Sequence, residues 1–98
     1  MYSSYPEAQY RAYKNEIDKK IIQTLNSGNY ILGEQVKKFE KSFARFCDTK
    51  YAVGVNSGTD ALLLALKALD IGQGDEVITV SHTALATLSA IISSGAKP

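Results

Sequence analysis

Two short polar stretches carry the residue types that could do chemistry in this chain. The first, "NSGTD" at 56–60, follows an apolar run and precedes a leucine-rich stretch. A turn that feeds a helix collects free backbone N–H groups and the positive end of the helix dipole, which together suit an anion. Ser57 and Thr59 carry hydroxyls that can cap the helix or bond phosphate oxygens, and Gly58 lets the backbone approach with a positive φ angle. The same residues also fit an ordinary capped turn, because the stretch lacks the glycine pattern of a P-loop or dinucleotide loop.

The second stretch, "SHT" at 81–83, has the same setting between an apolar run and a helical pattern. The carboxyl ends of parallel strands meet at one edge of a sheet, so we expect Ser57 to Thr59 and Ser81 to Thr83 to face one crevice. His82, the single histidine, then lies at that edge. A surface or hydrogen-bonding role for this residue is the alternative to contact with a ligand.

Hydrophobic periodicity predicts the elements that would position these stretches. Apolar residues at three- and four-residue steps predict two amphipathic helices, and short apolar runs rich in β-branched residues predict strands between further helices. Gly28 and Gly95 follow helical patterns as C-terminal stops. The expected elements are helices at about 7–27 and 34–47, a strand at 51–55, a helix at 59–70, a strand at 76–80 and a helix at 84–94. This order predicts an α/β fold with an incomplete parallel sheet, divided into a helical segment at 1–50 and the start of an α/β domain at 51–98.

Bulk properties narrow the function class. The 98 residues carry a formal charge of +1 with both signs scattered, which argues against a nucleic-acid surface or a polybasic membrane patch. No leader or membrane span is evident, and the single cysteine, Cys47, fits a reducing compartment, so we expect a soluble cytoplasmic protein. Cys47 lies beside Phe43 and Phe46 and is expected to be a buried apolar residue. No metal site is predicted.

Several motifs taken together resemble the start of one enzyme family. "YILGEQVKKFEKSFARFC", "YAVGVNSGTDALLLALKAL" and "IGQGDEVITVSHTALAT", in this order, are similar to the DegT/DnrJ/EryC1/StrS aminotransferases. The resemblance runs from about residue 5 to the end of the sequence. It implies the N-terminal part of a fold-type I enzyme that uses pyridoxal 5'-phosphate. Many such enzymes transfer an amino group from an amino acid, here expected to be glutamate, to a nucleotide-linked keto-sugar, and act as homodimers.

The resemblance also implies roles for a few positions. The turn matching Ser57, Gly58 and Thr59 holds the phosphate of pyridoxal 5'-phosphate in the family. Many members stack an aromatic ring on the cofactor from the position of Ala84, which leaves His82 as the candidate ring in this sequence. The "SHTA" form resembles members that act on 3-keto-6-deoxy sugars of dTDP.

No catalytic residue is predicted among these residues. In the family, the lysine that binds the cofactor covalently and the aspartate that pairs with its pyridine nitrogen both match positions beyond residue 98. We therefore expect the 98-residue chain alone to be inactive. Two alternatives stay open: a non-catalytic binding or regulatory protein of the same fold, and an unrelated nucleotide-binding α/β domain.

Overall fold

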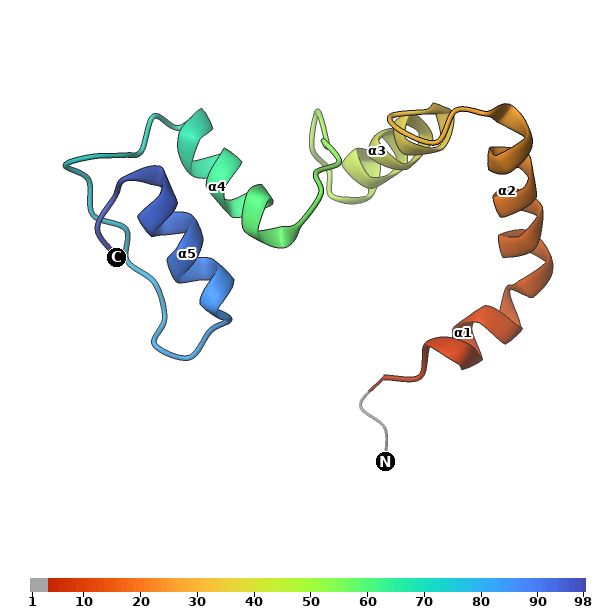
Figure 1. The fold of residues 1–98 in the computed structure, drawn as a ribbon, viewed down its shortest axis with the longest axis horizontal. Coiled ribbons are helices and arrows are strands. Elements are labelled where there is room, and N and C mark those ends of the chain that lie inside the picture. The colour runs from red at the N-terminus through yellow and green to blue at the C-terminus, as the bar shows by residue number, and fades with distance from the viewer. Residues whose placement is uncertain (1–3) are drawn as a thin grey trace. The chain divides into compact units, whose positions relative to one another are not determined.

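A computed structural model describes residues 4–98, and the described chain contains five α-helices (Figure 1). The chain divides into two compact units, one ending at Ala52 and the other beginning at Val53. The first unit holds α1, α2 and α3, and the second holds α4 and α5. The helices span Pro6–Ala12 (α1), Lys14–Ser27 (α2), Glu34–Phe46 (α3), Gly58–Ala68 (α4) and Leu85–Ser94 (α5).

The predicted single helix at about 7–27 is wrong at one point, because the helix is interrupted at Tyr13. This residue has φ −114° and ψ 17°, outside regular helical values, and separates α1 from α2. The amide of Glu16 donates to the carbonyl of Tyr13, three residues back, rather than four. The C-terminal stop was correctly predicted: Gly28 adopts the left-handed conformation with φ 65°, and its amide donates to the carbonyl of Leu25.

The third helix agrees with the predicted range of 34–47 to within one residue. Its start requires glycine, because a Cβ atom on Gly33 would lie 2.8 Å from the carbonyl oxygen of Asn29. Phe39 and Phe43 stack on one face of α3 with ring centroids 5.4 Å apart, and Phe46, whose side chain is 85% exposed, continues the row.

The prediction that Cys47 is buried is wrong, since it lies exposed at the end of α3. In the described part of this unit, no element covers the face that carries the phenylalanine row. Ala44 is the only buried hydrophobic residue that the described helices of this unit contribute. The amphipathic pattern of α3 is therefore present, but the apolar face of the helix is not buried in the described part of this unit.

In the second unit, α4 and α5 pack against each other and supply a small core. Ala90 and Ile91 on α5 are 1% and 3% exposed. Both helices run in the same direction, so that their N-terminal ends lie at one end of the pair (Figure 1). Gly95 ends α5 with φ 97°, as its place in the sequence predicted.

The predicted strands at 51–55 and 76–80 are not formed, so the α/β prediction is wrong for the described chain as it stands. The described residues hold one isolated parallel bridge, between Glu76 and Lys97. Two backbone bonds of 2.9 Å make it, from Val77 to the carbonyl of Lys97 and from Lys97 to the carbonyl of Asp75. A strand needs a neighbour along its whole length, and the pairing of 76–80 in the described residues is limited to this one bridge. The side chain of Ile78 is accordingly 99% exposed.

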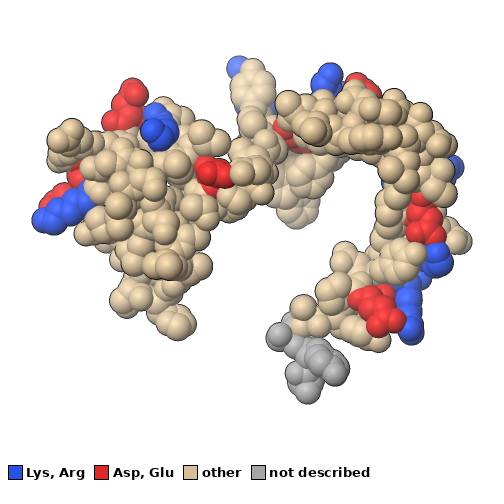
Figure 2. Space-filling model, viewed as in Figure 1, with Lys and Arg blue, Asp and Glu red and all other residues tan. Residues whose placement is uncertain are grey.

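On the face drawn in Figure 2, the basic and acidic side chains are interspersed among wide tan areas. Many of the large apolar side chains of the described residues are exposed, which agrees with the small cores. None of the described helices combines the length and the hydropathy that crossing a membrane would require.

Candidate functional site

The first polar stretch forms the N-terminal end of α4, and Ser57 caps it. Ser57 has extended dihedral angles, φ −154° and ψ 161°, and its Oγ accepts a hydrogen bond of 3.1 Å from the amide of Asp60. The Ser57 hydroxyl in turn donates to Oδ2 of Asp60 at 2.9 Å. The carbonyl of Ser57 accepts from the amide of Ala61 at 3.0 Å, which starts the helical pattern. The Ser57 hydroxyl therefore both donates and accepts a hydrogen bond within the turn.

The spacing of Ser57 and Asp60 in the sequence already indicates this pair of contacts. A serine followed three residues later by an acidic residue is a capping signature, in which two side chains and the backbone satisfy each other. The acidic side chain also interacts favourably with the positive end of the helix dipole. Of the two roles predicted for the Ser57 hydroxyl, the structure shows helix capping.

The donors left over at this end of α4 belong to the next two residues. The amides of Gly58 and Thr59 and the hydroxyl of Thr59 have no hydrogen-bond partner among the described residues. Free first-turn amides are expected, because the first N–H groups of a helix have no partner within it. Three donors at this end of α4 thus lack an acceptor among the described residues, beside a helix dipole whose sign favours an anion.

Gly58 contributes open space rather than an unusual backbone angle. The predicted positive φ angle is wrong, because Gly58 is the first residue of α4, and the described glycines with positive φ are Gly28, Gly74 and Gly95. Apart from its chain neighbours and the backbone of its own helix, no atom lies within 4 Å of a Cβ atom built on Gly58. The side-chain position of Gly58 is therefore open space next to the free amides of the first turn. These residues fit the anion that the cofactor would bring.

The second polar stretch lies before α5 and has a looser geometry. Ala84 precedes the helix in an extended conformation and provides no side-chain cap. Thr83 and Thr87 are joined through their hydroxyl oxygens at 3.0 Å. His82 is exposed and makes no hydrogen bond to any described residue. The structure thus brings the starts of α4 and α5 to the same end of the unit, but no bond joins His82 to Ser57, Gly58 or Thr59 (Figure 1).

An apolar hollow of about 190 Å³ lies between α4, α5 and the extended segment 77–79. It is smaller than the roughly 300 Å³ at which small-molecule pockets begin, and neither polar stretch lines it. Its walls carry little hydrogen-bonding capacity. The residues are Leu62, Ala65, Leu66, Leu69, Val77, Ile78, Thr79, Thr87, Ala90 and Ile91.

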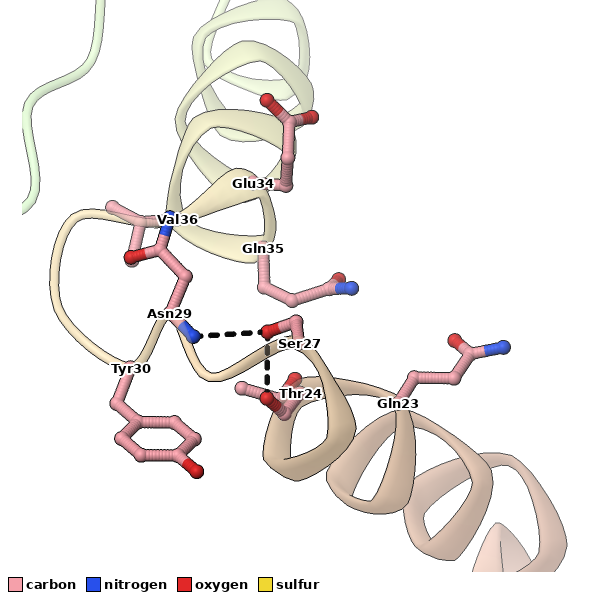
Figure 3. A pocket seen from close by; sticks show the side chains of 9 residues that line it. Gln23, Thr24, Ser27, Asn29, Tyr30, Glu34, Gln35 and Val36 are labelled. Atoms are coloured by element: carbon pink, nitrogen blue, oxygen red, sulfur yellow. Dashed lines mark hydrogen bonds between the residues drawn. The ribbon is translucent and has the colours of Figure 1, made fainter.

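A polar hollow of about 80 Å³ lies where α2 turns into α3 (Figure 3). Ser27 donates to the carbonyl of Thr24 at 2.7 Å and accepts from the amide of Asn29 at 3.2 Å. The hydroxyl of Tyr30 donates to the carbonyl of Leu25 at 3.1 Å. These contacts close the turn between the helices, and the space is too small for a cofactor.

Comparison of the sequence with known proteins identifies a family and several relatives of this chain. The model of the DegT/DnrJ/EryC1/StrS aminotransferase family matches residues 11–98. A dTDP-3-amino-3,4,6-trideoxy-alpha-D-glucose transaminase from Streptomyces venezuelae is 50% identical over 92 residues, which are 94% of this chain and 24% of the relative. A dTDP-3-amino-3,6-dideoxy-alpha-D-galactopyranose transaminase from Aneurinibacillus thermoaerophilus is 49% identical over 86 residues, 88% of this chain and 24% of the relative.

The fold has a close counterpart among solved structures. The crystal structure of S. venezuelae DesV in complex with a ketimine intermediate superposes with a TM-score of 0.89 and 50% identity. The match covers 94% of this chain and 25% of DesV. The chain therefore spans about a quarter of the length of the relatives that it matches, and it corresponds to the N-terminal part of fold-type I aminotransferases.

Proposed function

Because the chain belongs to the DegT/DnrJ/EryC1/StrS aminotransferase family, we propose that the protein containing it is a pyridoxal phosphate-dependent aminotransferase. Its substrates are a nucleotide-linked keto-sugar and an amino acid donor, glutamate. The names of two relatives, both transaminases of dTDP-linked 3-amino sugars, support this substrate class. Membership of the family removes the alternative of an unrelated nucleotide-binding domain.

The observation that carries the proposal is the set of free donors at the start of α4. In the proposed site, the amides of Gly58 and Thr59 and the hydroxyl of Thr59 bind the phosphate of pyridoxal 5'-phosphate. The open space at Gly58 admits the phosphate, and the helix dipole favours its charge. The cofactor supplies the electron sink for amino-group transfer, and this chain's residues hold its phosphate end. Binding energy far from the reacting carbon then fixes the orientation of that carbon.

Ser57 acts in this site as the residue that orients the donors. Its hydroxyl is engaged with Asp60 on both sides, so the turn is rigid before any ligand arrives. A donor set that is already ordered loses less entropy when the anion binds. Ser57 therefore belongs to the cofactor site by positioning Gly58 and Thr59.

His82 is the second element of the proposed site. Its imidazole is exposed, has no partner among the described residues and lies in the stretch that leads into α5. In the assembled protein we place it against the cofactor ring, in the role that the methyl group of Ala84 cannot fill. Residues 51–98 then form the start of the cofactor-binding large domain, residues 1–50 form its N-terminal helical segment, and the protein acts as a cytoplasmic homodimer.

The experiment is an amino-transfer assay with a protein of full family length that contains this chain. The protein is mixed with pyridoxal 5'-phosphate, glutamate and a dTDP-linked 3-keto-6-deoxy sugar, and 2-oxoglutarate and amino sugar are measured together. We expect the two products in equal amounts, and no product from the 98-residue chain. Cofactor binding without product on any keto-sugar tested would instead favour the regulatory protein of the same fold.

A further inference from the structure

The interruption at Tyr13 brings three polar side chains together on the outside of α1 and α2. The hydroxyl of Tyr10 donates to Oδ1 of Asp18 at 3.0 Å and accepts from Nζ of Lys14 at 3.0 Å. Lys14 also forms an ion pair with Oδ2 of Asp18. Nζ of Lys14 lies 5.2 Å from the centroid of the Tyr10 ring, so the ammonium group faces both the ring and its hydroxyl.

A straight helix would not permit this arrangement. Tyr10 and Asp18 are eight residues apart, which is about 12 Å along a regular helix. Helical side chains also lean toward the N-terminus, so Tyr10 would point away from Asp18. The contact between them therefore exists only when the helix is bent between the two residues, and the bend lies at Tyr13.

Nothing in the local sequence requires the bend. No proline or glycine lies near Tyr13, and the apolar periodicity of the sequence fits one helix over about 7–27. The bent form and a straight form are thus two arrangements of one segment. A side-chain contact that exists in only one of the two forms shifts the population toward that form.

We propose that Tyr10, Lys14 and Asp18 form a clasp that holds this segment in the bent form, in equilibrium with a single straight helix. Lys14 and Asp18 can pair in either form, because they are four residues apart on α2. The Tyr10 hydroxyl is the part of the clasp that discriminates between the forms. Its removal therefore shifts the population toward the straight helix.

The test is a distance measurement across the bend by pulsed electron paramagnetic resonance. Spin labels are placed at Ala8→Cys and Gln23→Cys, with Cys47→Ser to remove the exposed native thiol. A straight helix separates these positions by about 22 Å along its axis. With the clasp intact we expect a shorter main distance, and with Tyr10→Phe the population near 22 Å rises by about twofold or more.

Tyr13→Phe is the matched control, because the hydroxyl of Tyr13 has no partner among the described residues. It should leave the distance distribution unchanged. Asp18→Ala removes the acceptor of the Tyr10 hydroxyl and should shift the population in the same direction as Tyr10→Phe, so that a folding failure of one variant leaves the other decisive. A main distance of about 22 Å with the clasp intact, no shift in Tyr10→Phe and Asp18→Ala, or an equal shift in Tyr13→Phe would overturn the proposal.

Discussion

Replacing Ser57 by alanine removes the side-chain cap of α4 and tests how the proposed phosphate site is held. The helix has 11 residues, fewer than the roughly 12 to 15 that an isolated helix needs to be stable in water. Its first turn depends on the bond from the Asp60 amide to Oγ of Ser57, and no other residue provides a side-chain cap. Loss of such a cap costs about 1 kcal/mol, within a range of roughly 0.5 to 2.

This cost predicts a measurable change in hydrogen exchange. One kcal/mol corresponds to a roughly fivefold increase in the open population of the first turn. The amide of Asp60 should therefore exchange about five times faster in Ser57→Ala, as followed by NMR on the 98-residue chain. Ser57→Asn should restore protection, because asparagine caps helices about as well as serine.

Thr59→Val is the matched control for the capping prediction. The hydroxyl of Thr59 has no partner among the described residues, and valine keeps its β-branched shape, so exchange at Asp60 should change by less than about twofold. Unchanged exchange in Ser57→Ala, or an equal loss of protection in Thr59→Val, would refute the assignment of Ser57 as the cap.

Two further predictions concern stability and pH. Gly95→Ala places a Cβ atom 3.2 Å from the amide nitrogen of Gln73 on a residue with φ 97°. It should lower the free energy of unfolding by about 1 to 2 kcal/mol and the urea midpoint of the second unit by about 1 M. The effect of Gly28→Ala should be smaller, because no atom lies within 4 Å of a Cβ atom built there. Hydrogen bonds from Lys14 and then Tyr10 lower the pKa of the Asp18 carboxyl, and the bond to Asp18 raises the pKa of Lys14. The contribution of Asp18 is present above its ordinary pKa and is lost as the pH falls through the lowered value, whereas that of Lys14 is lost only as the pH rises through its raised value. The helical circular dichroism signal of α1 and α2 should therefore not change between about pH 5 and 9. The neighbouring Glu7 and Arg11 pair with each other. A transition within that pH window would contradict the prediction.

Features fixed by local chemistry could be predicted from the sequence. The range of α3 follows from its amphipathic period, and Gly28 and Gly95 end helices because they adopt left-handed angles at little cost. The cap of α4 follows from a serine three residues before an aspartate. The break at Tyr13 could not be predicted, because it involves contacts between side chains eight residues apart rather than a helix-breaking residue.

Features that depend on neighbours could not be predicted from the chain's own pattern. The run 76–80 has strand composition, but its pairing in the described structure is limited to one bridge at Glu76. Phe46 and Ile78 have the sequence pattern of core residues and are exposed, because the described units offer nothing to cover them. For the candidate site, local spacing allowed an anion at the start of α4, and only the combination of motifs suggested which cofactor carries it.

The most direct test of the central claim measures whether the Thr59 hydroxyl binds the cofactor's phosphate. In a protein of full family length, the affinities for pyridoxal 5'-phosphate and for pyridoxal, which lacks the phosphate, are compared by absorbance for Thr59→Val and for the control Thr24→Val, whose hydroxyl only donates to the carbonyl of Lys20. A hydrogen bond to a charged group contributes about 1.5 to 3 kcal/mol. We predict that Thr59→Val weakens pyridoxal 5'-phosphate binding by about 10- to 150-fold and leaves pyridoxal binding unchanged. Equal losses for both ligands, or no loss for either, would contradict a phosphate site at the start of α4.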